Sequence, residues 1–367
     1  MSRQTSNLQQ SRLELHLDFL GASKGPRILS KMPDGTILLT GASGLVGFRI
    51  LEKLVDEGWQ IRLAVRSEFK LSALKEGLKK AGKQASRIEH AVVPDMSKSG
   101  AFEDAIKGVK YVVHVASPLP GAATDDLEAS LIKPAVSVTT GILQSILQSP
   151  EKSVKKVVIT SSVAAVFPSE PKPFDADHTE PDPAGPYPDV FSAYAASKKL
   201  AYNATRKLID EQKPYFDIIN VMPTFVVGPN GFALTRKDYD ESSNMFALAS
   251  LLGRSMPGDS PGMACHVDDV AAVHVAALRE DVTGHLNFGV NYNGANGGVD
   301  WNDASEIVKK RLPDLVGEHG FPLGGSVSSM KVPFDASKTE RELGMKFKDL
   351  DTMIVDLARA YLHTKAA

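Results

Sequence analysis

The sequence lacks three features, each of which is typical of a distinct class of protein. Its 367 residues include one cysteine, Cys265, so neither an internal disulfide nor a thiolate metal cluster can form. Lysine and arginine number 42 against 44 acidic residues, a net charge of −2, which leaves no basic excess for a nucleic-acid backbone. No unbroken apolar run approaches the roughly 18 residues that a membrane span needs. We therefore expect neither a nucleic-acid nor a membrane partner.

The N-terminal segment carries no recognisable targeting signal. Residues 1–10 are polar and no unbroken apolar segment follows, so we expect no secretion signal. Together with the single cysteine, this favours a reducing compartment and a cytoplasmic location. Residues 1–33 are interpreted as an appendage. Leu13–Phe19 alternates like a strand, but Leu13, Leu17 and Leu20 also share a helix face, so both assignments stay open.

The pattern becomes regular from Thr36 onward. Thr36–Thr40 is predicted to be a strand buried on both faces, Leu45–Glu57 an amphipathic helix, and Ile61–Val65 the next strand. Further strands and two long helices are predicted at Ala91–Val93, Tyr111–Val115, Val157–Thr160, Ile218–Met222, Leu127–Gln148 and Ala193–Glu211. This alternation is typical of an α/β protein with a doubly wound parallel sheet.

A glycine-rich turn links the first strand to the first helix. It runs from Gly41 to Gly47, with glycine also at position 44. Glycines here allow a sharp turn, a close approach of the backbone to a pyrophosphate, and tight helix–strand packing. The helix N-terminus then offers free N–H groups to phosphate. The turn predicts dinucleotide binding, and the expected contacts are Gly41, Ser43, Gly44, Leu45, Val46 and Gly47.

The end of the second strand indicates which dinucleotide is bound. An NAD site has an acidic residue there for the ribose 2′-hydroxyl, whereas an NADP site has an arginine for the 2′-phosphate. The residue is Arg66, so we expect NADPH, with Lys70 and Arg49 as weaker helpers.

Tyr194 and Lys198 are four residues apart on a predicted helix and therefore share one face. A neighbouring ammonium favours the phenolate and lowers the pKa of the tyrosine, so Tyr194 could exchange a proton with a carbonyl or alcohol oxygen. Upstream, the strand Val157–Thr160 ends in Ser161 and Ser162, at the edge where parallel sheets bind ligands. We predict Ser162, Tyr194 and Lys198 as catalytic residues and no metal site.

The expected organisation has three parts. Residues 1–33 form the appendage, and 34–228 form a dinucleotide-binding Rossmann core that carries the catalytic residues. Residues 229–367 are mostly a smaller, irregular substrate-binding region, in which 263–290 return to the core. The looser pattern after Gly228 and its several glycines support this division.

These motifs resemble the extended short-chain dehydrogenase/reductase family, and within it the dihydroflavonol-reductase-like group with its fungal ketone and methylglyoxal reductases. The similar stretches are Thr40–Gly47, Ala64–Arg66, Pro94–Met96, Val113–Pro118, Thr160–Ser162, Tyr194–Lys198, Pro223–Pro229 and His266–Val270. The family needs nothing like residues 1–33, and 231–262 carries no readable substrate signature.

The resemblance implies several further roles. Asp95 would contact the adenine, with Met96 beside it; Ala116, flanked by Val115 and Ser117, would lie along the cofactor, and Pro223 would lie beside the nicotinamide. Lys198 would also bind the nicotinamide ribose.

The resulting hypothesis is NADPH-dependent reduction of an aldehyde or ketone to an alcohol by a monomer or homodimer, on a secondary-metabolite carbonyl of polyketide type. Three alternatives stay open: a nucleotide-sugar epimerase or dehydratase, a steroid-type 3β-hydroxy dehydrogenase, and a non-catalytic NADPH-sensing regulator. His114 is interpreted as a packed, hydrogen-bonded residue of a strand, with a lining role near the cofactor as the alternative. His266 is interpreted as a loop cap and Cys265 as a small buried residue.

Overall fold

The computed structural model describes residues 34–170, 172–294 and 297–366. The predicted appendage, with its strand or helix near Leu13, lies outside the described residues. The main feature is a seven-stranded sheet in which every neighbouring pair is parallel, in the order β11-β7-β5-β4-β1-β2-β3. The strands are β1 (Thr36–Thr40), β2 (Gln60–Val65), β3 (Ile88–Val92), β4 (Val109–His114), β5 (Lys156–Thr160), β7 (Asp217–Pro223) and β11 (Leu286–Val290). The doubly wound parallel sheet predicted from the sequence is confirmed.

Alternating side chains of the strands serve two cores, one on each face of the sheet. In β1, Ile37 and Leu39 pack on one face, whereas Leu38 packs on the other, and all three are fully buried. Burial on both sides explains why these strands are continuous apolar runs.

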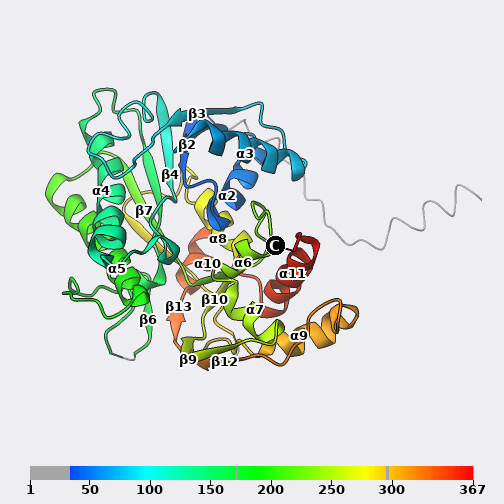
Figure 1. Ribbon diagram of the computed structural model, residues 1–367. Coiled ribbons are helices and arrows are strands. Elements are labelled where there is room, and N and C mark those ends of the chain that lie inside the picture. The colour runs from blue at the N-terminus through cyan, green and yellow to red at the C-terminus, as the bar shows by residue number, and fades with distance from the viewer. Residues whose placement is uncertain (1–33, 171, 295–296, 367) are drawn as a thin grey trace, which may run out of the picture. The chain divides into compact units, whose positions relative to one another are not determined.

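Helices cover both faces of the sheet (Figure 1). On one side lie α2 (Leu45–Asp56), α3 (Glu68–Lys80) and α8 (Val267–Ala276), which share a core with Ile37 and Leu39. On the other side lie α4 (Lys133–Gln148) and α5 (Val190–Gln212). The long helices predicted before Gln148 and around Tyr194 are present, while α3 was not predicted.

The stretch that leads into α4 differs from a regular α-helix in its first turns. Residues Glu128–Ile132 form a π-helical segment that continues into α4. Glu128–Gln148 is long and apolar enough, by length and composition alone, to cross a membrane, and half of its most apolar window is buried inside the protein. Val138, Ile142 and Ile146 pack into the sheet core, as expected for the core helix of a globular fold.

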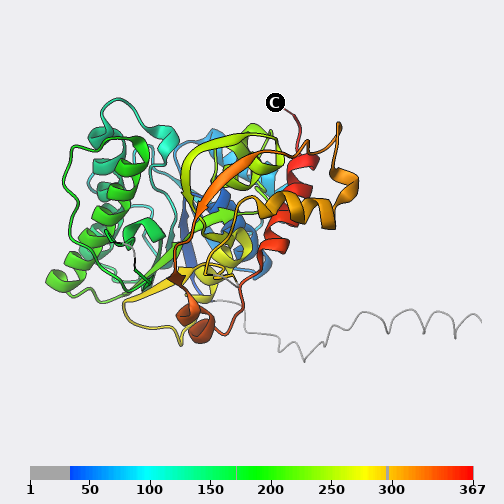
Figure 2. The same ribbon diagram turned by 90° about the horizontal axis from the view of Figure 1, so that it is seen from below.

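The C-terminal part has a core of its own. Its helices are α6 (Lys237–Asp240), α7 (Met245–Leu251), α9 (Asp303–Arg311) and α11 (Leu350–His363), and both ribbon views place α9 beside α11 (Figures 1 and 2). Trp301 is almost fully buried there and stacks on Phe246 with ring centroids 5.5 Å apart. Helix α10 (Ser337–Leu343) packs instead against β11 and α8.

Short parallel strand pairs lie outside the main sheet. They are β8 (Phe225–Val227) with β10 (Ala264–His266), β9 (Ser255–Pro261) with β12 (Ser326–Met330), and β6 (Phe174–Asp175) with β13 (Phe334–Asp335). The proline-rich stretch 168–188 contains only the two residues of β6 as regular structure among its described residues. The domain limits given above stay a prediction.

Gly47 should be indispensable for the packing of α2 on β1. A Cβ atom at this position would lie 2.0 Å from the backbone oxygen of Gly41, which cannot move away without displacing the turn. We expect Gly47→Ala to lower the free energy of unfolding by about 1–3 kcal/mol, measured by urea denaturation. Gly44→Ala is the matched control, because its Cβ would meet only the Gly41 oxygen at 3.7 Å, and we expect a loss below about 1 kcal/mol. Equal losses in both variants would contradict this account.

Candidate active site

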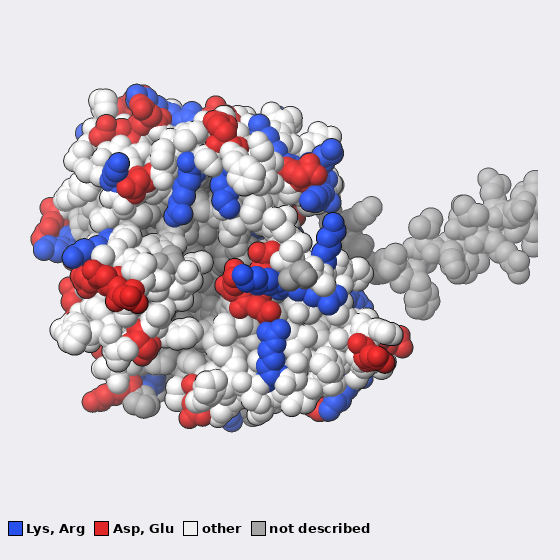
Figure 3. Space-filling model, in the orientation of Figure 1, with Lys and Arg blue, Asp and Glu red and all other residues white. Residues whose placement is uncertain are grey.

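The predicted site residues gather where the strand order reverses. β1 has β2 on one side and β4 on the other, so the chain crosses to opposite faces from this point, and ligands bind at the carboxyl ends of strands there. In the orientation of Figure 1, the surface is hollowed near its middle, between the side that carries α4 and α5 and the side that carries the C-terminal helices (Figure 3). Lysine or arginine side chains lie along the upper edge of this hollow.

The glycine turn has the geometry of a close-approach site. Gly41 has a φ of +71°, and a Cβ there would lie 2.6 Å from the backbone nitrogen of Ala116. Gly44 is exposed and precedes the first residue of α2, with no side chain to fill the space before the helix. The N–H groups of Leu45, Val46 and Gly47 therefore begin a helix whose N-terminus is open to a phosphate. Ser43 is half-buried within the same turn.

The residues expected around the ribose and adenine lie after β2 and β3. Arg66 follows the last residue of β2 and is exposed, and Ser67 caps α3 by accepting a hydrogen bond from the Lys70 backbone nitrogen. Hydrogen bonds from Ser97 hold the pKa of Asp95 below its usual range, and Arg66 contributes to the same lowering. Arg66 and Asp95 are therefore within electrostatic reach of one another, while the neighbouring Met96 is buried.

One polar side chain that the sequence reasoning did not single out organises the turn after β4. The Thr40 hydroxyl oxygen accepts hydrogen bonds from the backbone nitrogens of Val115 and Ala116, each at 3.1 Å, and lies 3.0 Å from Nδ1 of His114. It thereby ties the end of β1 to the segment expected to lie along the cofactor. A hydroxyl residue at the last position of a buried strand, just before the glycine turn, is the sequence signal that points to it.

The three predicted catalytic residues come together from two elements. Ser162 follows β5 and caps a short 3₁₀ turn (Val163–Ala165), with its oxygen accepting from the Ala164 backbone nitrogen at 3.2 Å. Tyr194 and Lys198 lie on one face of α5, with the Lys198 ammonium 5.5 Å from the centre of the Tyr194 ring. A hydrogen bond joins Tyr194 to Ser162, and Lys198 donates to the hydroxyl of Ser117 at 2.9 Å.

The electrostatics of this group differ from the sequence-based expectation in one respect. Burial raises the pKa of Tyr194, and its hydrogen bond with Ser162 acts in the opposite direction without outweighing it. The expected lowering by Lys198 does not dominate, because the ammonium is bound to Ser117 and lies over the ring rather than at the phenol oxygen. Burial also lowers the pKa of Lys198 to about 8. Tyr194 therefore keeps its proton at neutral pH, whereas Lys198 is an ammonium there and loses its charge as the pH rises past about 8.

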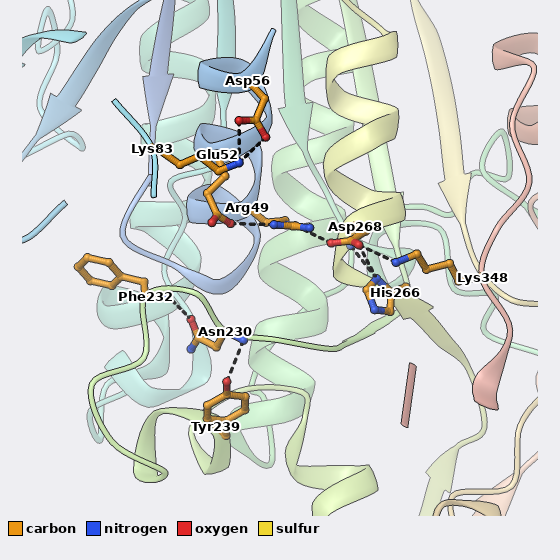
Figure 4. Close-up of polar contacts among 10 residues, drawn as sticks. All are labelled: Arg49, Glu52, Asp56, Lys83, Asn230, Phe232, Tyr239, His266, Asp268 and Lys348. Carbon is orange, nitrogen blue, oxygen red and sulfur yellow. Dashed lines mark hydrogen bonds and ion pairs between the residues drawn. The ribbon is translucent and has the colours of Figure 1, made fainter. Parts of the chain in front are cut away.

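Pro223 and Arg49 differ in how they relate to this site. Pro223 is buried at the end of β7, the strand next to β5, at the same carboxyl edge of the sheet. Arg49, expected to help hold the cofactor, instead forms ion pairs with Asp268 and Glu52 (Figure 4). Its guanidinium therefore binds one carboxylate of α8 and one of its own helix.

The remaining singled-out residues lie where the sequence placed them. Cys265 is fully buried, and burial raises the pKa of its thiol to about 12. His266 caps α8, its Nδ1 accepting from the Asp268 backbone nitrogen at 3.0 Å. His114 is packed at the end of β4 and hydrogen-bonded to Thr40. Among the described residues, no three His, Cys, Asp or Glu side chains gather in a way that could hold a metal ion.

Comparison with known proteins identifies the family. The sequence model of the NAD dependent epimerase/dehydratase family matches residues 37–289. Ketoreductase CTB6 of Cercospora beticola is 34% identical over 346 residues, which cover 90% of this chain and 96% of that protein. The putative NADPH-dependent methylglyoxal reductase GRP2 of Candida albicans is 29% identical over 340 residues, covering 88% and 96%.

A solved structure shows the same architecture. Yeast methylglyoxal/isovaleraldehyde reductase Gre2, crystallised with NADPH, matches with a TM-score of 0.69 at 26% identity, covering 89% of this chain and 98% of that one. The resemblance expected from the motifs is confirmed by the family match and by the similarity to fungal reductases along nearly the whole described length. The chain belongs to the NAD dependent epimerase/dehydratase family, in its extended short-chain dehydrogenase/reductase form.

Proposed function

We propose that the protein reduces an aldehyde or ketone to an alcohol with NADPH. The observation that carries this proposal is the joint placement of Ser162, Tyr194 and Lys198 beside the glycine turn, with Ser162 and Tyr194 hydrogen-bonded to each other. The names of relatives support it, since they include a ketoreductase and reductases described as NADPH-dependent or crystallised with NADPH.

The glycine turn, Arg66 and Lys198 have the chemistry that NADPH needs. The open N-terminus of α2 suits a pyrophosphate, because Gly44 leaves its approach free and Gly41 keeps the turn tight. The exposed guanidinium of Arg66 suits the 2′-phosphate, which it can bind through two parallel hydrogen bonds. The Lys198 ammonium donates a hydrogen bond to Ser117, and in this proposal it also binds the ribose.

The chemistry divides between cofactor and protein. When bound, NADPH supplies the hydride that adds to the carbonyl carbon. Ser162 and Tyr194 donate hydrogen bonds to the carbonyl oxygen and polarise it. The Tyr194 hydroxyl then gives its proton to that oxygen as charge develops there, which leaves an alcohol and a phenolate. The Lys198 ammonium stabilises this phenolate until a proton from solvent restores the phenol.

The surroundings of Tyr194 favour an apolar substrate. Phe191 lies on the same helix, three residues before Tyr194, and is 61% exposed; Leu119 follows Ser117 by two residues and is 57% exposed. We take these two side chains as candidate contacts for an apolar substrate. A small-molecule ketone of the secondary-metabolite, polyketide type fits these side chains.

The alternatives make different demands on the protein. A nucleotide-sugar epimerase or dehydratase regenerates its cofactor and would be purified with nicotinamide bound, whereas a reductase consumes added NADPH. A steroid-type 3β-hydroxy dehydrogenase would prefer NAD, which Arg66 disfavours. A sensor that binds NADPH has no use for a hydrogen-bonded Ser162–Tyr194 pair beside Lys198.

The proposal includes a location and an assembly. A protein with one deeply buried thiol, Cys265, suits a reducing compartment, so we place it in the cytosol. Its assembly, a monomer or a homodimer, is measurable by light scattering.

Tyr194→Phe is expected to abolish turnover. The substitution removes the proton donor but keeps the ring, so kcat should fall at least ~100-fold while the dissociation constant for NADPH changes little. The measurement is NADPH oxidation against aldehydes, diketones and cyclic ketones, together with NADPH fluorescence titration. Tyr361→Phe is the matched control: Tyr361 and Lys365 repeat the same spacing, but Tyr361 packs in the C-terminal core. Comparable kcat in Tyr194→Phe and the wild type would refute the mechanism.

Arg66→Gln is expected to erase the preference for NADPH over NADH. Loss of a charge-assisted contact to the 2′-phosphate should raise the NADPH dissociation constant ~10–100-fold, whereas NADH binding should stay within about twofold. Lys70→Gln tests the weaker helper and should change NADPH binding by less. If NADPH and NADH affinities fell together in Arg66→Gln, the residue would serve the fold rather than the phosphate.

Activity is expected to decrease as the pH rises through about 8. Burial lowers the pKa of Lys198 to about 8, so the ammonium predominates below that pH and is lost above it. Tyr194 keeps its proton over this range because burial raises its pKa. The measurement is kcat/KM from pH 5 to 10 at saturating NADPH, with Lys198→Arg as the variant whose charge persists. A rate that increases through pH 8 would show that Lys198 acts in its neutral form.

A further inference from the structure

A small internal cavity lies directly behind Lys198. It is lined by residues of α5, α4, β4, β5 and β7, and its polar lining includes His114, Ser117, Thr139, Lys198, Thr205 and Asn220. Its volume is about 10 Å³, about the room that one water molecule occupies. His114 and Lys198 are only 1% and 6% exposed, so both side chains are largely withdrawn from bulk solvent.

Hydrogen bonding at Thr40 fixes which nitrogen of His114 carries the proton. The Thr40 oxygen already accepts from two backbone N–H groups, those of Val115 and Ala116. A hydroxyl has two acceptor sites and one proton, so the proton of Thr40 must point to Nδ1 of His114, 3.0 Å away. Nδ1 is therefore an acceptor, and the neutral imidazole bears its hydrogen on Nε2.

This Nε2–H group is left without a partner in the protein. Nε2 is buried and has no hydrogen-bond partner among the described residues. Thr40 binds the opposite edge of the ring and does not line the cavity, which His114 itself lines. Because Nδ1 is already bonded to Thr40, we take the free N–H edge to face this cavity, which Lys198 also lines. A buried donor without an acceptor is costly, so an acceptor belongs there.

We propose that this cavity binds one water molecule, which accepts hydrogen bonds from Nε2–H of His114 and from the Lys198 ammonium, and that His114 is thereby a positioning residue for Lys198. The water has an acceptor for its own proton in Thr205. The hydroxyl of Thr205 donates to the Ala201 carbonyl at 2.9 Å, which leaves its oxygen free to accept. Such a water has the two to four polar partners that buried waters have.

The Lys198 ammonium depends on such a water because no carboxylate among the described residues lies near it to stabilise its charge. Burial lowers the pKa of His114 to about 3, with Lys198 contributing, so the imidazole stays neutral wherever the enzyme works. The titratable groups that face Lys198 are Tyr194 and Tyr202 on its own helix and His114 on β4; no carboxylate contributes to the lowered pKa of Lys198. A water fixed by His114 then stabilises the ammonium and aims it toward Ser117 and the ribose.

Three substitutions of His114 test the roles of its two ring nitrogens separately. Asn places its amide near Nδ1, where it can accept from Thr40, and does not reach the cavity. Gln carries an N–H donor to the Nε2 position, and Phe keeps the ring shape but has neither group. The inference rests on the proposed function, because it concerns a lysine that serves NADPH and the proton donor.

We expect the variants that lack an N–H donor toward the cavity to differ from the variant that keeps one. In His114→Asn and His114→Phe, the alkaline limb of kcat/KM for methylglyoxal with NADPH should move down by about one pH unit, the effect of losing one hydrogen bond to a charged group. Above pH 9 that shift is an about tenfold lower kcat/KM. His114→Gln should keep the wild-type limb. NADPH titration over the same pH range gives a second readout that needs no turnover.

His274 supplies the matched control. It is also fully buried, but both of its ring nitrogens are partnered: Nε2 lies 2.7 Å from the Thr160 hydroxyl, and Nδ1 lies 2.8 Å from the Val270 carbonyl. His274→Asn should lower stability as any buried truncation does, while leaving the alkaline limb in place. If His114→Asn behaved in the same way, His114 would be a structural residue and the proposal would be wrong.

The tautomers can be observed directly and without activity. Because a carbonyl only accepts, His274 must carry its hydrogen on Nδ1, the opposite of His114. NMR of protein labelled with ¹⁵N-histidine should therefore show an Nε2–H imidazole for His114 and an Nδ1–H imidazole for His274, each assigned by its variant. An Nδ1–H form at His114 would overturn the inference, even in an active enzyme. If the protein reduced no carbonyl, the proposed function would fail, but the tautomer and NADPH titrations would still test the water site.

Discussion

The contact between the ends of β1 and β4 is the constraint on which the site depends. The two strands run side by side, and at their carboxyl ends the chain can continue only if Gly41 has no Cβ, since that atom would lie 2.6 Å from the Ala116 nitrogen. Thr40 then closes the contact with one hydroxyl that serves two backbone N–H groups and one imidazole. The position of the glycine turn and that of the Val115–Ser117 segment are thus set together.

The hydrogen bond between Lys198 and Ser117 links this contact to the predicted catalytic residues. Ser117 ends the segment that Thr40 holds, and it receives the hydrogen bond of the Lys198 ammonium. Helix α5 is therefore linked to the edge of the sheet at the same level as Tyr194. The burial that restricts the Lys198 side chain also lowers its pKa to about 8. The positioned ammonium therefore loses its proton more easily than an exposed lysine does.

The sequence alone predicted the features that depend on local pattern. The buried strands, the glycine turn and the i, i+4 spacing of Tyr194 and Lys198 are readable because each follows from residues close together in the chain. Helix α3 was missed, although Leu71, Leu74 and Leu78 mark its buried face, because charged residues fill the rest of it. The pairing of Arg49 with Asp268 spans 219 positions, and the raised pKa of Tyr194 depends on burial; neither is a property of local sequence.

The Arg49 pairing also bears on how the chain divides. Asp268 binds Arg49 from α2 and Lys348 from the C-terminal segment (Figure 4). The ammonium nitrogen of Lys348 also lies 3.8 Å from a carboxylate oxygen of Asp356 in α11. Half-buried charges of this kind cost free energy when one partner is removed, so they hold the elements in one arrangement. The helix whose N-terminus faces the expected cofactor is thus fixed in part by residues near the end of the chain. A boundary near residue 228 therefore separates the expected roles of the two parts, but ion pairs that stabilise the fold cross it.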